Sequence, residues 1–185
     1  MLEREIRFKI DDKIKDSIIN SSKLIEENTK CIDLCMGKYG FDSLDKLGYI
    51  IRLRNKNDKI TMESKRRIDK NKWNEISIPL ESLKIGYDFL YNLNLRPYLY
   101  INREREVRRI KQAKIYIDKV DLLGTYAEFE LNDGFEFEDL EEYLKEHNIK
   151  GEPCKLYGDI FKENMQDDKF KSNFEEALEQ FLQNN

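Results

Sequence analysis

Four short segments of this chain carry charged residues on alternate positions, in pairs of like sign. In the first segment, Ile6, Phe8 and Ile10 occupy the positions between the charges. A period of two is the period of a β-strand, so each segment has one charged face and one apolar face. The charged positions, in chain order, are Glu3, Glu5, Arg7 and Lys9; Arg52 and Arg54; Arg103 and Arg105; and Glu128 and Glu130. The pattern predicts strands on which acidic and basic pairs are kept apart.

Two orientations of these charged faces are compatible with the pattern. In most antiparallel sheets the charged face meets solvent and the apolar face forms the core. Exposed faces usually mix both signs, and the separation seen here favours the other orientation, with the charges inside a barrel and the apolar faces beneath helices. Paired carboxylates bind divalent metals and paired guanidiniums bind phosphates, so this orientation predicts a site for a metal-bound polyphosphate. We expect such an enclosed basic cluster to repel itself when it is empty.

The overall composition excludes a strong electrostatic field of one sign over the whole protein surface. Charged residues make up 38% of the 185 residues, but 33 Lys and Arg against 37 Asp and Glu leave a net charge of only −4. A general attraction to nucleic acid or to a membrane surface is therefore not expected. The length suits one domain spanning residues 1–185, with residues 172–185 as a C-terminal helix.

Cysteine and histidine usage narrows the chemistry further. Cys31, Cys35 and Cys154 cannot form a fully paired disulfide framework and lack the spacing of a zinc site, which favours a reducing cytoplasm. No apolar stretch approaches the roughly 18 residues of a membrane span. His147 is the only histidine and lies in a segment with the pattern of a surface helix, so histidine-based acid–base catalysis is not expected.

Periodicity along the chain predicts about eight strands, a number that can close into a barrel. The expected strands cover residues 3–10, 30–37, 49–54, 59–67, 73–78, 98–110, 114–121 and 125–132. The expected helices cover residues 11–28, 81–93, 136–147 and 172–183, with Asp11 or Asp12 as the N-cap of the first. The fold class is therefore α+β, an eight-stranded antiparallel barrel with a charged lumen and flanking amphipathic helices.

The charged strands also resemble a known family in their order. Residues 3–8, EREIRF, resemble the E-x-E-x-K signature that opens CYTH domains, the triphosphate tunnel metalloenzymes. Residues 49–54, YIIRLR, resemble the family's arginine strand, and residues 117–130, IDKVDLLGTYAEFE, are similar to its aspartate strand, glycine turn and closing E-x-E strand. Thr61 and Lys65, Glu75, and the pair Arg103 and Arg105 resemble further strands of the family. The resemblance extends from residue 1 to about residue 163.

The resemblance implies an antiparallel tunnel, open at both ends, that binds a triphosphate with Mg²⁺ or Mn²⁺. It places at the metal Glu3, Glu5, Asp118, Glu128 and Glu130. It places at the phosphates Arg7, Arg52, Arg54, Lys65, Arg103 and Arg105. The catalytic set that it implies is Glu3, Glu5, Arg7, Glu128 and Glu130.

Three positions depart from the family pattern. Arg7 stands where the signature has a lysine, which keeps the charge but replaces a compact ammonium with a planar fork. Glu63 stands two residues after Thr61, where many members have the lysine that here is Lys65. Ser77 follows Glu75 where a second acidic residue often occurs.

Three functions follow from these residues. The first is hydrolysis of an inorganic or organic triphosphate such as tripolyphosphate, ATP or thiamine triphosphate. The second is a class IV adenylyl cyclase that converts ATP to cyclic AMP and pyrophosphate, toward which residues 123–128, LGTYAE, lean in sequence. The third is a non-catalytic polyphosphate- or nucleotide-binding module. A small-molecule triphosphate is the expected partner, without nucleic acid or membrane, and a homodimer is left open.

Overall fold

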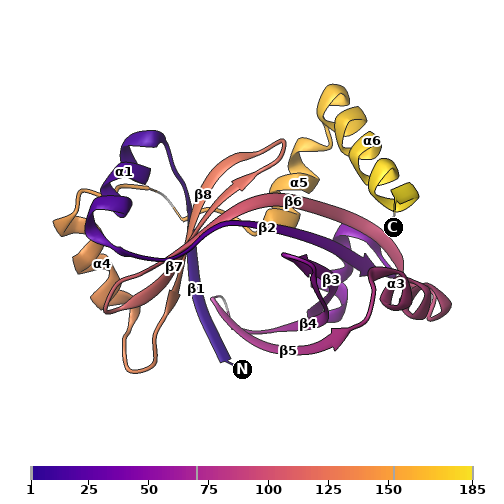
Figure 1. The fold of residues 1–185 in the computed structure, drawn as a ribbon, viewed down its shortest axis with the longest axis horizontal. Coiled ribbons are helices and arrows are strands. Elements are labelled where there is room, and N and C mark those ends of the chain that lie inside the picture. Colours follow the sequence, from indigo (N-terminus) through magenta and orange to yellow (C-terminus); the bar gives the residue numbers. More distant parts are fainter. Residues whose placement is uncertain (1, 70, 152, 185) are drawn as a thin grey trace. The chain divides into compact units, whose positions relative to one another are not determined.

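The computed structural model describes residues 2–69, 71–151 and 153–184. Within these residues, eight strands form a closed barrel in the order β1-β5-β4-β3-β2-β6-β7-β8, with six α-helices attached (Figure 1). The strands are β1 Leu2–Lys9, β2 Lys23–Gly37, β3 Tyr49–Lys56, β4 Lys59–Asp69, β5 Lys72–Leu80, β6 Arg96–Arg109, β7 Ala113–Val120 and β8 Gly124–Leu131. The predicted eight-stranded antiparallel barrel is confirmed.

The helices lie before, between and after the strands. They are α1 Asp12–Ser21, α2 Ser43–Leu47, α3 Leu83–Asn92, α4 Phe137–Glu146, α5 Tyr157–Asn164 and α6 Asp168–Asn184, with a 3-10 turn η1 Gly40–Asp42. In the part of the chain that the structure describes, none of them has both the length and the apolar character needed to cross a membrane. His147 ends α4 and is exposed, as the sequence predicts.

The chain divides into two compact units, each built from separate stretches of sequence. Unit 1 comprises Leu2, Lys30–Asn102 and residues 156–184. Unit 2 comprises Glu3–Thr29 and Arg103–Lys155. The long strands β2 and β6 therefore contribute residues to both units. The single-domain organisation expected from length stays a prediction.

In unit 2, strands β1, β7 and β8 carry an apolar face that α1 and α4 cover. Phe8, Ile115 and Phe129 are at most 5% exposed, and they pack in one core with Ile18 of α1 and Leu140 of α4. The two helices lie side by side, joined by a 2.6 Å hydrogen bond between the hydroxyls of Ser21 and Tyr143 (Figure 1). Because this apolar face is the helix-covered one, the charged residues of the same strands lie on the opposite, inner face.

In unit 1, α3 and α6 cover the apolar face of β2 and β3. Leu34, Leu53, Leu90 and Phe181 are each buried in one core. A Cβ atom on Gly86 would come within 2.6 Å of the Leu53 side chain, so glycine lets α3 lie close against β3. The charges of β3 and β4 again occupy the other face. The inward orientation of the charged faces is thus confirmed in both units.

The predicted end of the first helix is wrong. The helix begins as expected, with the Asp11 carboxylate accepting a 2.8 Å hydrogen bond from the Ile14 N–H, but it ends at Ser21. Residues 23–28 are instead the first part of β2. Arg108 of β6 donates hydrogen bonds to the carbonyl oxygens of Ile19 and Ser22, at 2.9 and 3.0 Å, and so satisfies the end of the helix from a distant strand.

Two further segments differ from the sequence-based expectation. The stretch 39–48, expected as a plain connection, contains η1 and α2, and α5 was not predicted. The turn between β3 and β4 consists of two residues, Asn57 and Asp58. Asn57 and Asp58 both have positive φ, 46° and 64°, the left-handed conformation that asparagine and aspartate tolerate in a two-residue hairpin.

Candidate active site

The inner face of unit 2 gathers eight of the predicted site residues, which we call the unit 2 cluster. They are Glu3, Glu5, Arg7, Arg103, Arg105, Asp118, Glu128 and Glu130. Strand register explains why they meet. The antiparallel pairing of β1 with β8 sets Glu5 opposite Glu130 and Arg7 opposite Glu128. Glu3 lies two residues before Glu5 and therefore on the same face of β1.

The direct opposition of Glu5 and Glu130 is the most informative feature of this cluster. Side chains opposite each other in an antiparallel pair have Cβ atoms about 4.5–5.5 Å apart, and like charges in this position destabilise a sheet. Glu5 is only 7% exposed, so water screens its charge poorly. The neighbouring carboxylate, Glu128, forms an ion pair with the Arg7 guanidinium. Both charges of this opposed pair, Glu5 and Glu130, would attract a cation.

Tyr116 joins this cluster, although the sequence did not single it out. Its hydroxyl donates a 2.8 Å hydrogen bond to Oε2 of Glu130. Its ring lies 4.2 Å from the Arg105 guanidinium carbon and 4.8 Å from the Lys114 ammonium nitrogen. Burial, and then the negative charge of Glu130, raise the pKa of Tyr116, so the phenol stays protonated and acts as a donor. Its position two residues before Asp118 on β7 was the available signal.

Asp118 is fully buried between two arginines. Its two carboxylate oxygens accept hydrogen bonds from Arg105, at 2.6 and 2.7 Å, and the Arg103 Nε lies 3.5 Å away. Burial alone would raise the pKa of Asp118, but the charges of Arg105 and Arg103 outweigh it and hold the pKa below its ordinary value. The same ion pair raises the pKa of Arg105 against its own burial. In these contacts Asp118 orients the guanidiniums, and its role as a metal ligand stays a prediction.

The inner face of unit 1 carries a second charged group, the unit 1 cluster. Its members are Asp33 of β2, Arg52 and Arg54 of β3, Thr61, Glu63 and Lys65 of β4, and Glu75 of β5. Arg52, Arg54 and Lys65 were predicted here as phosphate ligands. Asp33 was not, and its signal was a single charged residue between Cys31 and Cys35 in the otherwise uncharged stretch 31–37, CIDLCMG.

The arginines of the unit 1 cluster are bonded to carboxylates. Arg54 donates to both oxygens of Asp33, at 2.6 and 2.9 Å. Arg52 donates through Nε to Glu63 and through Nη2 to Glu75 at 3.1 Å. Lys65 is 8% exposed, and its ammonium lies 5.4 Å from the ring of the buried Trp73. Three carboxylates thus accompany three basic side chains, and the expectation of a self-repelling basic cluster is wrong for unit 1.

Three carboxylates of the unit 2 cluster are possible ligands of a divalent cation. Mg²⁺ and Mn²⁺ prefer carboxylate oxygens, and Glu5, Glu128 and Glu130 supply them from two neighbouring strands. Among residues 2–69, 71–151 and 153–184, however, no three His, Cys, Asp or Glu side chains converge as a metal-binding group. The carboxylates therefore fit such a cation in kind, and they would have to turn toward each other to bind it.

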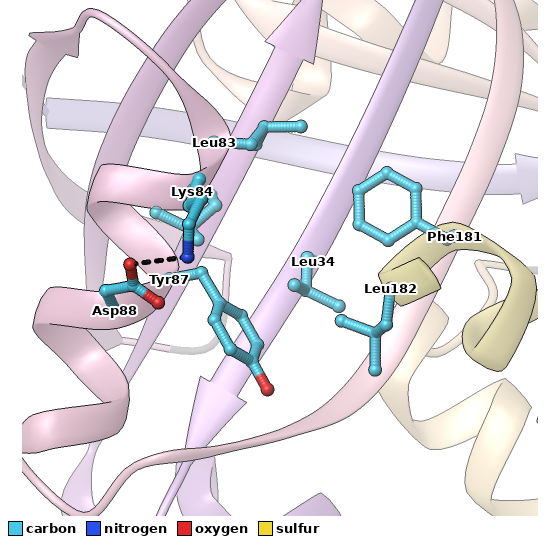
Figure 2. A pocket seen from close by; sticks show the side chains of 8 residues that line it. Leu34, Leu83, Lys84, Tyr87, Asp88, Phe181 and Leu182 are labelled. Carbon is cyan, nitrogen blue, oxygen red and sulfur yellow. Dashed lines mark hydrogen bonds and ion pairs between the residues drawn. The ribbon is translucent and has the colours of Figure 1, made fainter. Parts of the chain in front are cut away.

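A pocket of about 150 Å³ lies elsewhere in unit 1, on the helix-covered side of the sheet. Tyr87 of α3 and Phe181 and Leu182 of α6 surround it, above Leu34 (Figure 2). Its charged rim is an ion pair within α3, Lys84 with Asp88 at 2.8 Å. None of the residues that line this pocket belongs to either charged cluster. Its apolar walls do not suit a polyphosphate.

Comparison with known proteins adds evidence on the fold. No protein-family model and no curated protein matches the sequence. The solved structure of PH1819 from Pyrococcus horikoshii is similar, with a TM-score of 0.74 and 19% identity over 88% of this chain and 99% of that one. A candidate adenylate cyclase from Vibrio parahaemolyticus has a TM-score of 0.66 and 16% identity over 88% of this chain and 98% of its own.

A third similar structure comes with a described activity. HpAC1 from Hippeastrum, a candidate adenylyl cyclase whose structure is described as revealing a dominant triphosphatase activity, has a TM-score of 0.61. It is 16% identical over 84% of this chain and 91% of its own. At such identities the likeness concerns the fold. This chain has the triphosphate-tunnel fold that its strand motifs predict.

Proposed function

We propose that this chain is an enzyme that transfers a phosphoryl group of a triphosphate with the help of a divalent metal, and that the reaction is hydrolysis. The observation that carries the proposal is the opposition of Glu5 and Glu130 on the inner face of unit 2, which also carries Arg7, Arg103 and Arg105. Carboxylates that gain from a cation, beside guanidiniums that bind phosphate oxygens, are what a metal-bound polyphosphate requires.

The residues of the unit 2 cluster have separable roles in this proposal. Glu5, Glu128 and Glu130 would hold Mg²⁺ or Mn²⁺, with Glu3 at the margin. Arg105, aligned by Asp118, would donate to phosphate oxygens and stabilise the charge that develops on them during transfer. When bound, the metal would neutralise phosphate charge and lower the pKa of the attacking water. The phenol of Tyr116 would hold Glu130 in one orientation.

Arg7 has a different role from the lysine that it replaces. Its guanidinium is committed to Glu128, so it balances a carboxylate of the proposed metal site as well as facing the substrate. If the position needs only positive charge, Arg7→Lys should keep turnover within a few-fold. If a compact ammonium is required, the same change should raise turnover.

A cyclase reaction is the second candidate. Two similar structures are described as candidate adenylyl cyclases, and the run at residues 123–128 leans the same way. In that reaction the 3′-hydroxyl of ATP attacks the α-phosphorus and pyrophosphate leaves. The same carboxylates and arginines would serve it, because both reactions stabilise a phosphoryl group in transfer.

The test is to incubate the protein with ATP and, separately, with tripolyphosphate, in Mg²⁺ or Mn²⁺, and to resolve the products by phosphorus NMR. Orthophosphate from either substrate is the expected result. If the products are cyclic AMP and pyrophosphate, the reaction is that of a cyclase and the proposed hydrolysis is wrong. Binding without turnover would make the chain a non-catalytic polyphosphate-binding module, and the absence of binding would reject all three functions.

A further inference from the structure

Glu63 occupies an unusual place in the unit 1 cluster. It lies on β4 two residues after Thr61, directly opposite Arg52 of β3, at a position where many members of the family that this chain resembles have a lysine. It is only 5% exposed and points to the same inner face as Arg52 and Arg54. A buried carboxylate therefore stands among the groups that we propose as phosphate ligands.

The contacts of Glu63 show what it does to those ligands. Its Oε2 atom accepts a hydrogen bond from Nε of Arg52 and lies 3.2 Å from Nη1 of Arg54. Its Oε1 atom accepts a 2.9 Å hydrogen bond from the Thr61 hydroxyl. One carboxylate thus bridges both guanidiniums and is held in place by a third side chain.

The remaining edges of the two guanidiniums also face carboxylates. Arg54 uses Nε and Nη2 for Asp33, and Arg52 uses Nη2 for Glu75. A phosphate oxygen seeks the same N–H groups as a carboxylate oxygen. A phosphate that binds Arg52 and Arg54 together therefore competes with Glu63, and also with Asp33, which lies 3.8 Å from Nη1 of Arg52.

That exchange has an electrostatic cost unless a cation comes with the anion. If Glu63 is displaced but remains buried, its charge loses its partners, and breaking such buried pairs is strongly unfavourable. If Glu63 stays, it repels the incoming phosphate at close range in a poorly screened site. A divalent cation between the carboxylate and the phosphate removes both costs, since each anion then faces positive charge.

We infer that Glu63 is a specificity-determining residue that admits a polyphosphate to Arg52 and Arg54 only together with a divalent cation. The inference rests on the proposed function for the identity of the anion. It differs from a purely structural role, in which Glu63 would affect stability but not the dependence of anion binding on cations. The depressed pKa of Glu63, held down by Arg52 and Arg54 against burial, keeps the charge present at neutral pH.

The experiment measures tripolyphosphate affinity by isothermal titration calorimetry, with MgCl₂ and, at matched ionic strength, with EDTA. We expect the wild type to bind at least about tenfold more weakly in EDTA, which corresponds to about 1.4 kcal/mol. Glu63→Gln should bring the two affinities within about threefold by strengthening metal-free binding. Glu63→Asp keeps the charge and should keep the cation dependence. Glu81→Gln removes an exposed carboxylate of the same unit and should behave as wild type.

The outcomes separate this inference from the proposed function. Wild-type protein that binds tripolyphosphate equally in MgCl₂ and EDTA leaves the proposed function standing and overturns the inference, whether or not the variants fold. Glu63→Gln that unfolds normally by heat yet keeps the wild-type ratio also overturns it. Wild-type protein that binds no tripolyphosphate even with Mg²⁺ overturns both.

Discussion

In unit 1 the carboxylates Asp33 and Glu63 are bonded to Arg52 and Arg54, whereas in unit 2 the carboxylates Glu5 and Glu130 lie opposite each other on neighbouring strands. The two clusters use the same residue types on the same kind of strand face. Both clusters contain ion pairs between opposite charges, but the strand register sets Glu63 opposite Arg52 in unit 1 and Glu5 opposite Glu130 in unit 2. Strand register alone produces this difference.

The difference indicates distinct tasks for the two clusters. Interleaved charges satisfy one another within the folded chain, so the unit 1 cluster contributes to stability and resists a bare anion. Two carboxylates directly opposite each other destabilise a fold, and a bound ligand of opposite charge offsets this destabilisation. We therefore expect the opposed carboxylates of the unit 2 cluster to bind a divalent cation.

The largest effect is expected from the most buried ion pair. Asp118→Asn leaves the Arg105 guanidinium buried without its bidentate partner, which should lower the free energy of unfolding by about 3–5 kcal/mol. Asp33→Asn is the matched change in unit 1 and should lower the free energy of unfolding by less. Its partner Arg54 also contacts Glu63, and the Arg54 side chain is 15% exposed. Urea unfolding measures both. Equal losses would break the comparison between the clusters.

The next effect concerns turnover. Glu130→Gln removes one of the two opposed charges without changing side-chain size, and we expect kcat to fall at least about 100-fold, or about 2.7 kcal/mol in activation free energy. Glu75→Gln removes a carboxylate that accepts a hydrogen bond from Arg52 in the other unit, and it should lower kcat far less. Steady-state phosphate release measures both, with circular dichroism as the control for folding. If Glu75→Gln loses more kcat than Glu130→Gln, the metal site lies in unit 1 and the assignment to unit 2 is wrong.

A smaller effect tests the orientation of Glu130. Tyr116→Phe removes the hydrogen bond to the carboxylate and should weaken Mn²⁺ binding about tenfold, the usual cost of losing a group that orients a metal ligand. Electron paramagnetic resonance of free Mn²⁺ reports the affinity without any turnover. Tyr143→Phe removes a phenol that bonds Ser21 on the helix-covered side and serves as the control. An unchanged Mn²⁺ affinity in Tyr116→Phe would show that Glu130 does not bind the metal in the orientation that Tyr116 gives it.

The smallest effect is the dependence of stability on pH. The pKa values of Asp118 and Glu63 are both lowered in the folded chain, so each carboxylate stabilises the fold above its unfolded pKa, and this contribution is lost as pH falls through the folded value. The melting temperature should therefore fall as pH drops below about 4.5, the ordinary value for glutamate. Asp118→Asn and Glu63→Gln should each make this acid decline shallower. A decline that changes in only one variant would assign the acid sensitivity to one unit.

Much of the fold followed from local patterns in the sequence. Alternation of period two placed the strands and identified their charged faces, because the side chains of a strand point to alternate sides whatever it pairs with. Asp11 capped the helix that follows β1, and Asn57 with Asp58 made the hairpin turn, because both effects depend on groups a few residues apart.

Only the tertiary structure decided which charges meet. Glu5 lies opposite Glu130 through a pairing of the first strand with the last, and the end of α1 depends on Arg108, far along the chain. Neither partner is visible in a local window, because register between distant strands is set by packing of the whole sheet. The same reason explains why Asp33 and Tyr116 escaped notice. Their chemistry comes from the neighbours that the barrel gives them, and the sequence determined only the face on which each would lie.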